Sequence, residues 1–301
     1  MLKQRTIQNE IKISGIGIHS GLKSEMKFKP APVNTGIVFH KKTPNNKVEI
    51  KSSVAYVINT SNQVTLGSKQ RKIQTVEHLL STLYALGISN CIIEVFTPEI
   101  PIMDGSAFPF VQAIKEAGIK EQNEYHKIIK IPHPIWVTEG DKYLVILPSS
   151  KQEFNFHISY PHVDLENQSF YISELTPDVY EKEIAQARTF GFYEDWEYLK
   201  KRGLANGASL ENTVVYNKDG IMNNNLRYKN EAVRHKMLDL IGDLSLLNAR
   251  IYGRILASKS GHKMDIELVS KIKKLILENK FTKKEIKENY KKFEKEVAFL
   301  L

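Results

Sequence analysis

The feature that most constrains the fold is a change in the spacing of apolar residues, which occurs twice along the 301-residue chain. In the first part of the chain, apolar and polar residues alternate in short runs broken by Gly, Pro and Asn, as in half-buried strands. The strands expected there are 11–18, 25–28, 36–40 and 48–58. The apolar spacing then lengthens to three or four residues, which predicts helices at 75–86 and 108–117 with a strand at 91–96 between them.

The second part of the chain repeats this order. The strands expected there are 127–131, 135–137, 143–147 and 153–159, and the helical patterns that follow are 230–249 and 265–279. The polar run 120–127 carries almost no apolar residue and is predicted to be a linker. Strands followed by helices in both parts indicate an α+β protein with two similar strand-plus-helix domains, at 1–122 and 127–280.

Positive charge gathers at the end of the chain. Lys and Arg outnumber Asp and Glu by 43 to 34, and residues 270–296 alone hold ten Lys against five Glu. Apolar residues recur there at helical spacing, which predicts a basic amphipathic helix at 281–301. We favour a helix that docks its apolar stripe (Ile286, Tyr290, Phe293 and Val297) on the protein. A peripheral contact with an anionic membrane surface is the alternative, and no nucleic-acid partner is expected.

The chain has the features of a cytoplasmic monomer. It contains no run of about 20 apolar residues that could span a bilayer, and its first residues lack the apolar core of a secretory signal. Its single cysteine, Cys91, lies in an apolar segment and is expected to be a small core residue.

A polar ridge runs along the expected helix 230–249. His235, Asp239 and Asp243 are spaced four residues apart, so they share one helix face, whereas the remaining faces are apolar. Burying an imidazole and two carboxylates without partners costs several kcal/mol, so they require either a metal ion or a dense hydrogen-bond network. The ridge alone does not decide between these two interpretations.

An adjacent carboxylate and imidazole, Glu77 and His78, stand on the expected helix 75–86. Metallohydrolases use such a pair, in which the histidine binds Zn²⁺ and the glutamate takes a proton from the activated water. His235 and Asp239 could supply two more ligands at the spacing that a chelating helix needs, which would leave the fourth position open.

A further histidine, His262, follows Ser258-Lys-Ser-Gly on a predicted glycine-containing loop. Asp243 could hydrogen-bond this imidazole and favour its charged form, which would suit a general acid or an oxyanion stabiliser. Taken alone, such a histidine is more often a surface residue.

The segment 191–216 departs from the regular pattern, because aromatic and apolar residues crowd its first positions and glycines loosen the backbone after them. It could be ordinary core, or an insert that lines an apolar ligand site.

Five separated motifs resemble, in order and spacing, those of the UDP-3-O-acyl-N-acetylglucosamine deacetylase family, LpxC. They are Thr75-Val-Glu-His-Leu, Pro101-Ile-Met-Asp-Gly-Ser-Ala107, Ala187-Arg-Thr-Phe-Gly191, Arg234-His-Lys-Met-Leu-Asp-Leu-Ile-Gly-Asp243 and Lys259-Ser-Gly-His262. The N-terminal Gly15-Ile-Gly-Ile-His-Ser-Gly21 fits as well, and the resemblance covers nearly the whole chain up to about residue 280.

The resemblance implies a role for each matching position. It places Zn²⁺ on His78, His235 and Asp239, with Glu77 as general base and His262 as general acid supported by Asp243. It further implies that Lys236 helps to hold the oxyanion and that Thr189, Phe190 and Phe192 contact the substrate. The metal in the cell, zinc or ferrous iron, stays open.

The same resemblance implies a fold and a reaction. The active site would lie between the two domains, each of which carries one insert, and the insert at about 191–216 would form an apolar passage for an acyl chain. The reaction is zinc-dependent deacetylation of UDP-3-O-(3-hydroxyacyl)-N-acetylglucosamine, which releases acetate in lipid A biosynthesis. Two alternatives stay open: a zinc amidohydrolase for another N-acyl sugar, and a basic binding protein whose polar ridge is structural.

Overall fold

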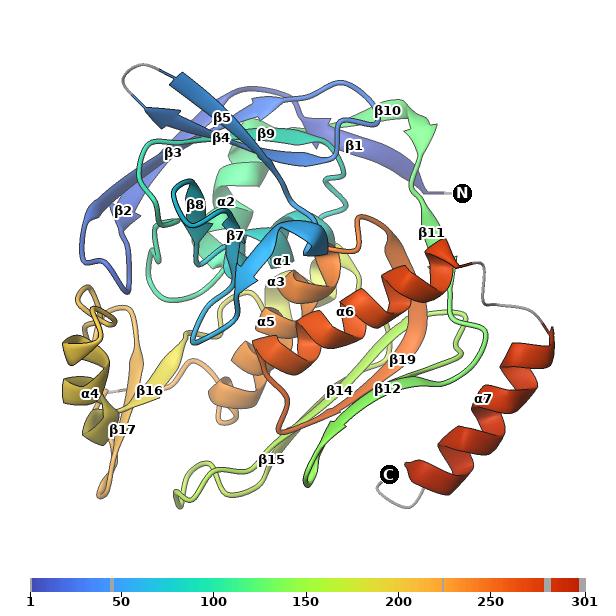
Figure 1. Ribbon diagram of the computed structural model, residues 1–301. Helices are drawn as coiled ribbons and strands as arrows, with labels where there is room; N and C mark the ends of the chain where they lie inside the picture. The colour runs from blue at the N-terminus through green and yellow to red at the C-terminus, as the bar shows by residue number, and fades with distance from the viewer. Residues whose placement is uncertain (1, 44–45, 224, 279–282, 298–301) are drawn as a thin grey trace.

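Two sheets built on one plan, one of five strands and one of six, form the frame of the molecule (Figure 1). The computed structural model describes residues 2–43, 46–223, 225–278 and 283–297. The first sheet has the order β2-β3-β9-β4-β5, with β2 (Ile11–Ile16), β3 (Lys23–Pro30), β9 (Cys91–Val95), β4 (Ile37–Thr43) and β5 (Asn46–Lys51). The second has the order β12-β13-β19-β14-β15, with β12 (Ile135–Glu139), β13 (Lys142–Leu147), β19 (Arg250–Ser258), β14 (Gln152–Ile158) and β15 (Gln168–Ile172).

The two sheets share the topology of these five strands, and the second sheet gains a sixth strand where β11 (Ile128–Lys130) pairs with β19. In each, two antiparallel hairpins flank a central strand that comes later in the chain, β9 or β19. That central strand pairs antiparallel with the first hairpin and parallel with the second. The α+β class with two similar strand-plus-helix units is therefore confirmed.

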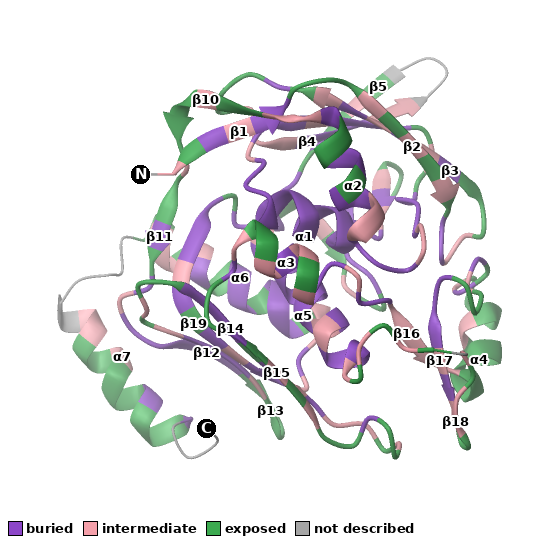
Figure 2. Ribbon diagram, turned by 180° about the vertical axis from the view of Figure 1, so that it is seen from behind, coloured by how far each residue is buried: buried purple, intermediate pink, exposed green. Residues whose placement is uncertain are grey.

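The helices lie between the two sheets (Figures 1 and 2). They are α1 (Glu77–Ala85), α2 (Phe108–Ala117), α5 (Glu231–Ser245) and α6 (His262–Leu277). All nine residues of α1 are buried, because this helix packs on α5 as well as on its own sheet. The expected stop after this helix is confirmed, since Gly87 adopts a positive φ of 74° that favours glycine.

The two units approach each other closely at a glycine of α5. A Cβ built on Gly242 would lie 2.2 Å from the backbone carbonyl oxygen of Glu77, so no side chain fits there without separating α1 from α5. We expect Gly242→Ala to lower the free energy of unfolding by about 1–3 kcal/mol, although alanine favours helices more than glycine does. Urea unfolding checks this, with Gly191→Ala as the control, because a Cβ there meets no atom within 4 Å and the φ of Gly191 is not positive. Equal stability of the Gly242 variant would contradict the close contact.

Two small three-stranded sheets extend from the frame, one from each unit. The first joins β6 (Val57–Asn59), β7 (Thr65–Gly67) and β8 (Lys72–Gln74). The second joins β16 (Phe190–Phe192), β17 (Val214–Asn217) and β18 (Gly220–Ile221), and it carries η2 (Tyr193–Asp195) and α4 (Trp196–Lys201) between its first two strands. They match the expectation of one insert per unit.

Three expectations about local structure were wrong. The polar run 120–127 is mostly strand β10 (Ile119–Tyr125), because it pairs with β1 (Lys3–Ile7) along its whole length. The strand expected at 48–58 is broken by the 3₁₀ turn η1 (Val54–Tyr56). His262 does not lie on a loop, because Gly261 is the N-cap of α6 and His262 is its first residue.

The C-terminal helix α7 (Lys283–Glu296) packs on the outer face of the second sheet. Phe293 and Val297 are buried against Trp136 and Val145, which confirms a docked helix, although Tyr290 remains partly exposed. The expected helix also included residues 281–282 and 298–301, which lie outside the described residues. The remaining element of the described residues is α3 (Pro177–Glu183). Within the described ranges, no helix has the length and apolar character needed to cross a bilayer.

Candidate metal centre and active site

Helices α1 and α5 bring three donor side chains to one point. The ligand atoms of His78, His235 and Asp239 all lie within 4.8 Å of one another, and all three residues are buried. Oδ1 of Asp239 is the common neighbour, 3.7 Å from Nε2 of His78 and 3.5 Å from Nε2 of His235. One donor comes from the first turn of α1 and two come from successive turns of α5.

The two imidazoles are held in the neutral form that can bind a metal ion. Burial, followed by the nearby His235, lowers the pKa of His78 to about 3, and burial also lowers the pKa of His235. Nδ1 of His235 lies 3.0 Å from the carbonyl oxygen of Ala187, so Nδ1 carries the proton and donates it there. The lone pair of Nε2 is therefore left facing Asp239.

The carboxylate of this cluster is held in the charged form. Burial opposes ionisation of Asp239, but Lys236 and then His235 lower its pKa below the usual range. Nζ of Lys236 donates to Oδ2 of Asp239 at 2.8 Å, which leaves Oδ1 directed at the two imidazoles. Two neutral imidazoles and one carboxylate are a donor set that suits Zn²⁺, and Nδ1 of His78 has no hydrogen-bond partner within the described part of the chain.

Glu77 stands beside this cluster without belonging to it. It is the first residue of α1 and is buried, and its Oε2 accepts a hydrogen bond from the backbone N–H of Val64 at 3.0 Å. Burial raises the pKa of Glu77 to about 7, although His262 opposes that shift. A carboxylate in this state can take up a proton near neutral pH.

A second cluster lies one turn further along α5. Nδ1 of His262 is 2.7 Å from Oδ2 of Asp243, so these two residues are as close as the expected hydrogen bond between them requires. Asp265, on α6, completes the group, because ligand atoms of all three residues lie within 4.8 Å of one another. Burial and then Asp239 raise the pKa of Asp243, and burial and then Asp243 raise the pKa of Asp265 to about 7. Because two close carboxylates do not both ionise readily, the pair favours a single negative charge beside His262.

Asp265 is the site residue that sequence reasoning missed. It lies on the buried stripe of α6, together with Leu268, Val269 and Ile272. A carboxylate on an otherwise apolar helix face is the same signal that identified the polar ridge on α5. This signal is present in the sequence, but Asp265 was not predicted to belong to the site.

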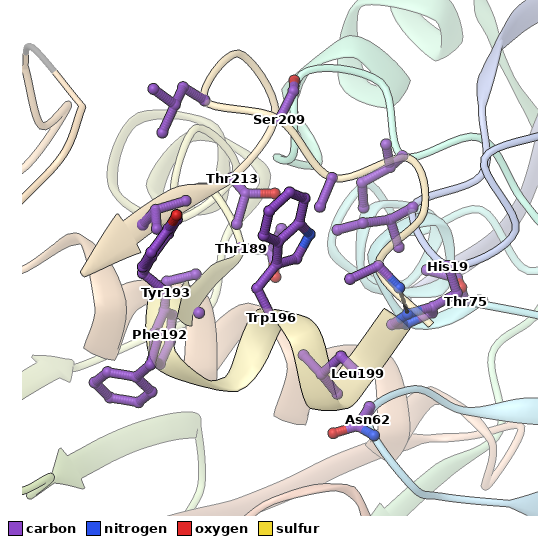
Figure 3. A pocket seen from close by; sticks show the side chains of 18 of the residues that line it. His19, Asn62, Thr75, Thr189, Phe192, Tyr193, Trp196, Leu199, Ser209 and Thr213 are labelled. Atoms are coloured by element: carbon purple, nitrogen blue, oxygen red, sulfur yellow. Dashed lines mark hydrogen bonds between the residues drawn. The ribbon is translucent and has the colours of Figure 1, made fainter. Parts of the chain in front are cut away.

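Two neighbouring cavities open on the cluster. The first, of about 470 Å³, is lined by His235, Lys236, Asp239 and His262, together with Arg202 and Tyr198 of the insert. The second, of about 350 Å³, contacts Glu77 and His78 and continues between apolar residues of the insert (Trp196, Leu199, Leu210 and Val215). Figure 3 shows Trp196 projecting from α4 toward the segment that carries Ser209 and Thr213. We call this second cavity the apolar passage.

The three expected substrate contacts lie where the two cavities meet. Thr189, Phe190 and Phe192 line both cavities, and the ring of Phe190 stands edge-on to His235 with ring centroids 6.4 Å apart. Tyr160 packs against the rings of Phe190 and Phe192 and lines the first cavity beside them. The segment 191–216 therefore lines both cavities, although Val214 and Tyr216 near its end are buried in the core.

The α+β fold and this site define a hydrolase with a candidate metal centre. The chain belongs to the LpxC family, UDP-3-O-acyl N-acetylglycosamine deacetylase, whose model matches residues 4–274. A protein of Leptospira biflexa named UDP-3-O-acyl-N-acetylglucosamine deacetylase is 44% identical over 283 residues, which cover 94% of this chain and 93% of the relative.

Two further relatives carry the same name. The protein of Pseudomonas entomophila is 43% identical over 90% of each chain. That of Syntrophus aciditrophicus is 42% identical over 89% of this chain and 85% of its own length. Helix α7 lies beyond the residues that the family model matches.

Proposed function

We propose that this chain removes the N-acetyl group of UDP-3-O-(3-hydroxyacyl)-N-acetylglucosamine and releases acetate, a step of lipid A biosynthesis. The observation that carries the proposal is the convergence of His78, His235 and Asp239 beside the buried carboxylate of Glu77. The relatives that cover nearly the whole chain are named for this deacetylation.

The three donors would hold Zn²⁺. When bound, the zinc supplies Lewis-acid chemistry that polarises the amide carbonyl and makes water nucleophilic near neutral pH. Glu77 accepts the proton of the attacking water, since its raised pKa lets it take up a proton and release it again. Val64 holds the carboxylate of Glu77 in place through its backbone N–H.

The leaving amine needs a proton, because an amide nitrogen departs poorly as an anion. His262 would donate it, and the contact between its Nδ1 and Oδ2 of Asp243 holds the imidazole in place. The ammonium group of Lys236, buried and held by Asp239, would stabilise the oxyanion together with Thr189.

The substrate would span both cavities. The larger cavity is polar enough for the UDP-sugar, and the apolar passage suits the 3-O-acyl chain. Phe190 and Phe192 would direct the two parts of the substrate into their cavities. We further propose that 1–122 and 127–280 are the two domains, and that the protein is a cytoplasmic monomer whose basic α7 assists contact with an anionic membrane surface.

Acetate release from substrates with different 3-O-acyl lengths tests this proposal. Each buried CH₂ is worth about 0.8 kcal/mol, so we expect kcat/KM to rise roughly fourfold per carbon until the passage is full. A chelator should abolish the activity, and N-acetylglucosamine should be a poor substrate. Equal rates with and without the acyl chain would favour an amidohydrolase for another N-acyl sugar. A folded protein without metal or activity would favour the binding protein.

A matched pair of variants locates the acyl chain. Ala208 lines the passage, whereas the nearby Glu211 is exposed and does not. Ala208→Trp should therefore shift the preference toward shorter chains, and Glu211→Trp should leave it unchanged. The same preference in both variants would place the acyl chain elsewhere.

A further inference from the structure

A third cavity, of about 330 Å³, lies at the C-terminal ends of α1 and α5, away from the metal centre at the first turn of α1. It is lined by the first unit, by the connection at His126 and Lys127, and by the second unit at 245–250. We call it the rear cleft. Nothing in the proposed reaction uses it.

The charges of the rear cleft are all of one sign. Lys51, Lys127 and Arg250 line it, and no Asp or Glu is among its lining residues. In the described ranges, none of these three cations has a carboxylate oxygen within 4.0 Å. Unpaired lysines are ordinary on a surface, so the informative residue is the buried Arg250.

Only part of the hydrogen-bonding capacity of the Arg250 guanidinium is used within the described residues. Its Nη1 donates to the carbonyl oxygen of Tyr84 at the end of α1, and its plane lies over the Tyr84 ring, 4.8 Å from the centroid. These neutral contacts orient the group but leave its charge without a counterion. The charge of Arg250 also acts on His126. Burial, and then the positive charge of Arg250, lower the pKa of His126 to about 4.

The other side of the rear cleft is apolar. The half-buried Ile37 contributes apolar surface beside the cationic groups, and the buried Leu80, Leu83 and Ile88 form the floor beneath it. A ligand for this surface needs a compact anionic head for the guanidinium and a short apolar body. From this juxtaposition we propose that the rear cleft binds a small organic anion, a phosphate monoester or carboxylate, with its head at Arg250 and its apolar part on Ile37 and the apolar floor of the cleft.

The rival interpretation is that Arg250 only caps the C-terminal end of α1, where a cation is favourable without any ligand. Calorimetric titration with hexyl phosphate, hexanoate and inorganic phosphate separates the two. We expect one alkyl anion to bind per chain, at least tenfold more tightly than inorganic phosphate. The better of the two alkyl anions identifies the head group. A failure of both alkyl anions to bind, or equally tight binding of inorganic phosphate, would overturn the proposal.

Variants then place the binding. Lys51→Gln with Lys127→Gln removes two exposed, unpaired cations of the cleft, so folding should be unaffected and binding should weaken about tenfold, or about 1.4 kcal/mol. The matched control is Lys69→Gln with Lys130→Gln, two exposed lysines outside the cleft, which should bind as the parent does.

Ala208→Trp narrows the apolar passage, so it should weaken any binding of the alkyl chain there. It should leave the titration unchanged, and loss of binding in this variant alone would assign the anion to the passage and overturn the proposal. Because the titration needs no catalytic turnover, its outcome is independent of the proposed reaction.

Discussion

Replacing Glu77 by alanine should lower turnover by about 10²–10⁴-fold while about one metal ion per chain stays bound. Glu77 lies beside the three donors but is not one of them, so its loss removes a proton acceptor and leaves the ligand set complete. Acetate release and elemental analysis of the same preparation measure both quantities.

Glu77→Gln is the matched control for this prediction. The amide oxygen can still accept the hydrogen bond from Val64, so the fold around the site should be retained although no proton can be taken up. We expect the same loss of turnover with unchanged stability. Normal turnover in either variant would show that Glu77 is not the general base.

Replacing His235 by alanine should remove both the metal and the activity. One of three donors is lost, so we expect metal affinity to fall by more than about 100-fold, since even residues that only orient a ligand account for 10–100-fold. Turnover should fall by at least about 10³-fold, because the metal contributes several kcal/mol to the barrier.

His157→Ala is the corresponding control. His157 belongs to β14 of the same unit and bonds Ser258, outside both cavities at the metal centre. That variant should keep its metal and its rate. A His235 variant that retained one ion per chain would mean that the donors lie elsewhere.

The sequence predicted the helices of the first unit well. The apolar stripe of α1 and the glycine after it are local signals, and the structure has this helix and α2 where those signals predict them. The central strand β19 was missed because it combines two arginines and a glycine with apolar residues. Its strand character depends on pairing with β13 on one side and β14 on the other, which no local pattern reveals.

The polar strand β10 was missed for a related reason. Its side chains are mostly exposed, so it lacks the alternation of a half-buried strand, and only its partner β1 makes it a strand. The rest of the second unit was predicted only in outline, since β15 and α3 were not expected.

The site could be predicted to a different degree at each level. Helical spacing places His235 and Asp239 on one face of α5, and this relation holds in the structure. Spacing could not predict that His78 of the other unit joins these two residues, because this depends on how α1 crosses α5. The residue types had suggested this grouping as one possibility and the family resemblance implied it, while the roles of the individual residues remain predictions.

The division of donors between α1 and α5 has a consequence for the enzyme as a whole. One unit contributes a single imidazole and the other contributes an imidazole and a carboxylate, so neither unit supplies all three donors alone. A bound ion would therefore link the two halves of the chain. Removal of the ion should therefore weaken the contact between α1 and α5, beside which both cavities open.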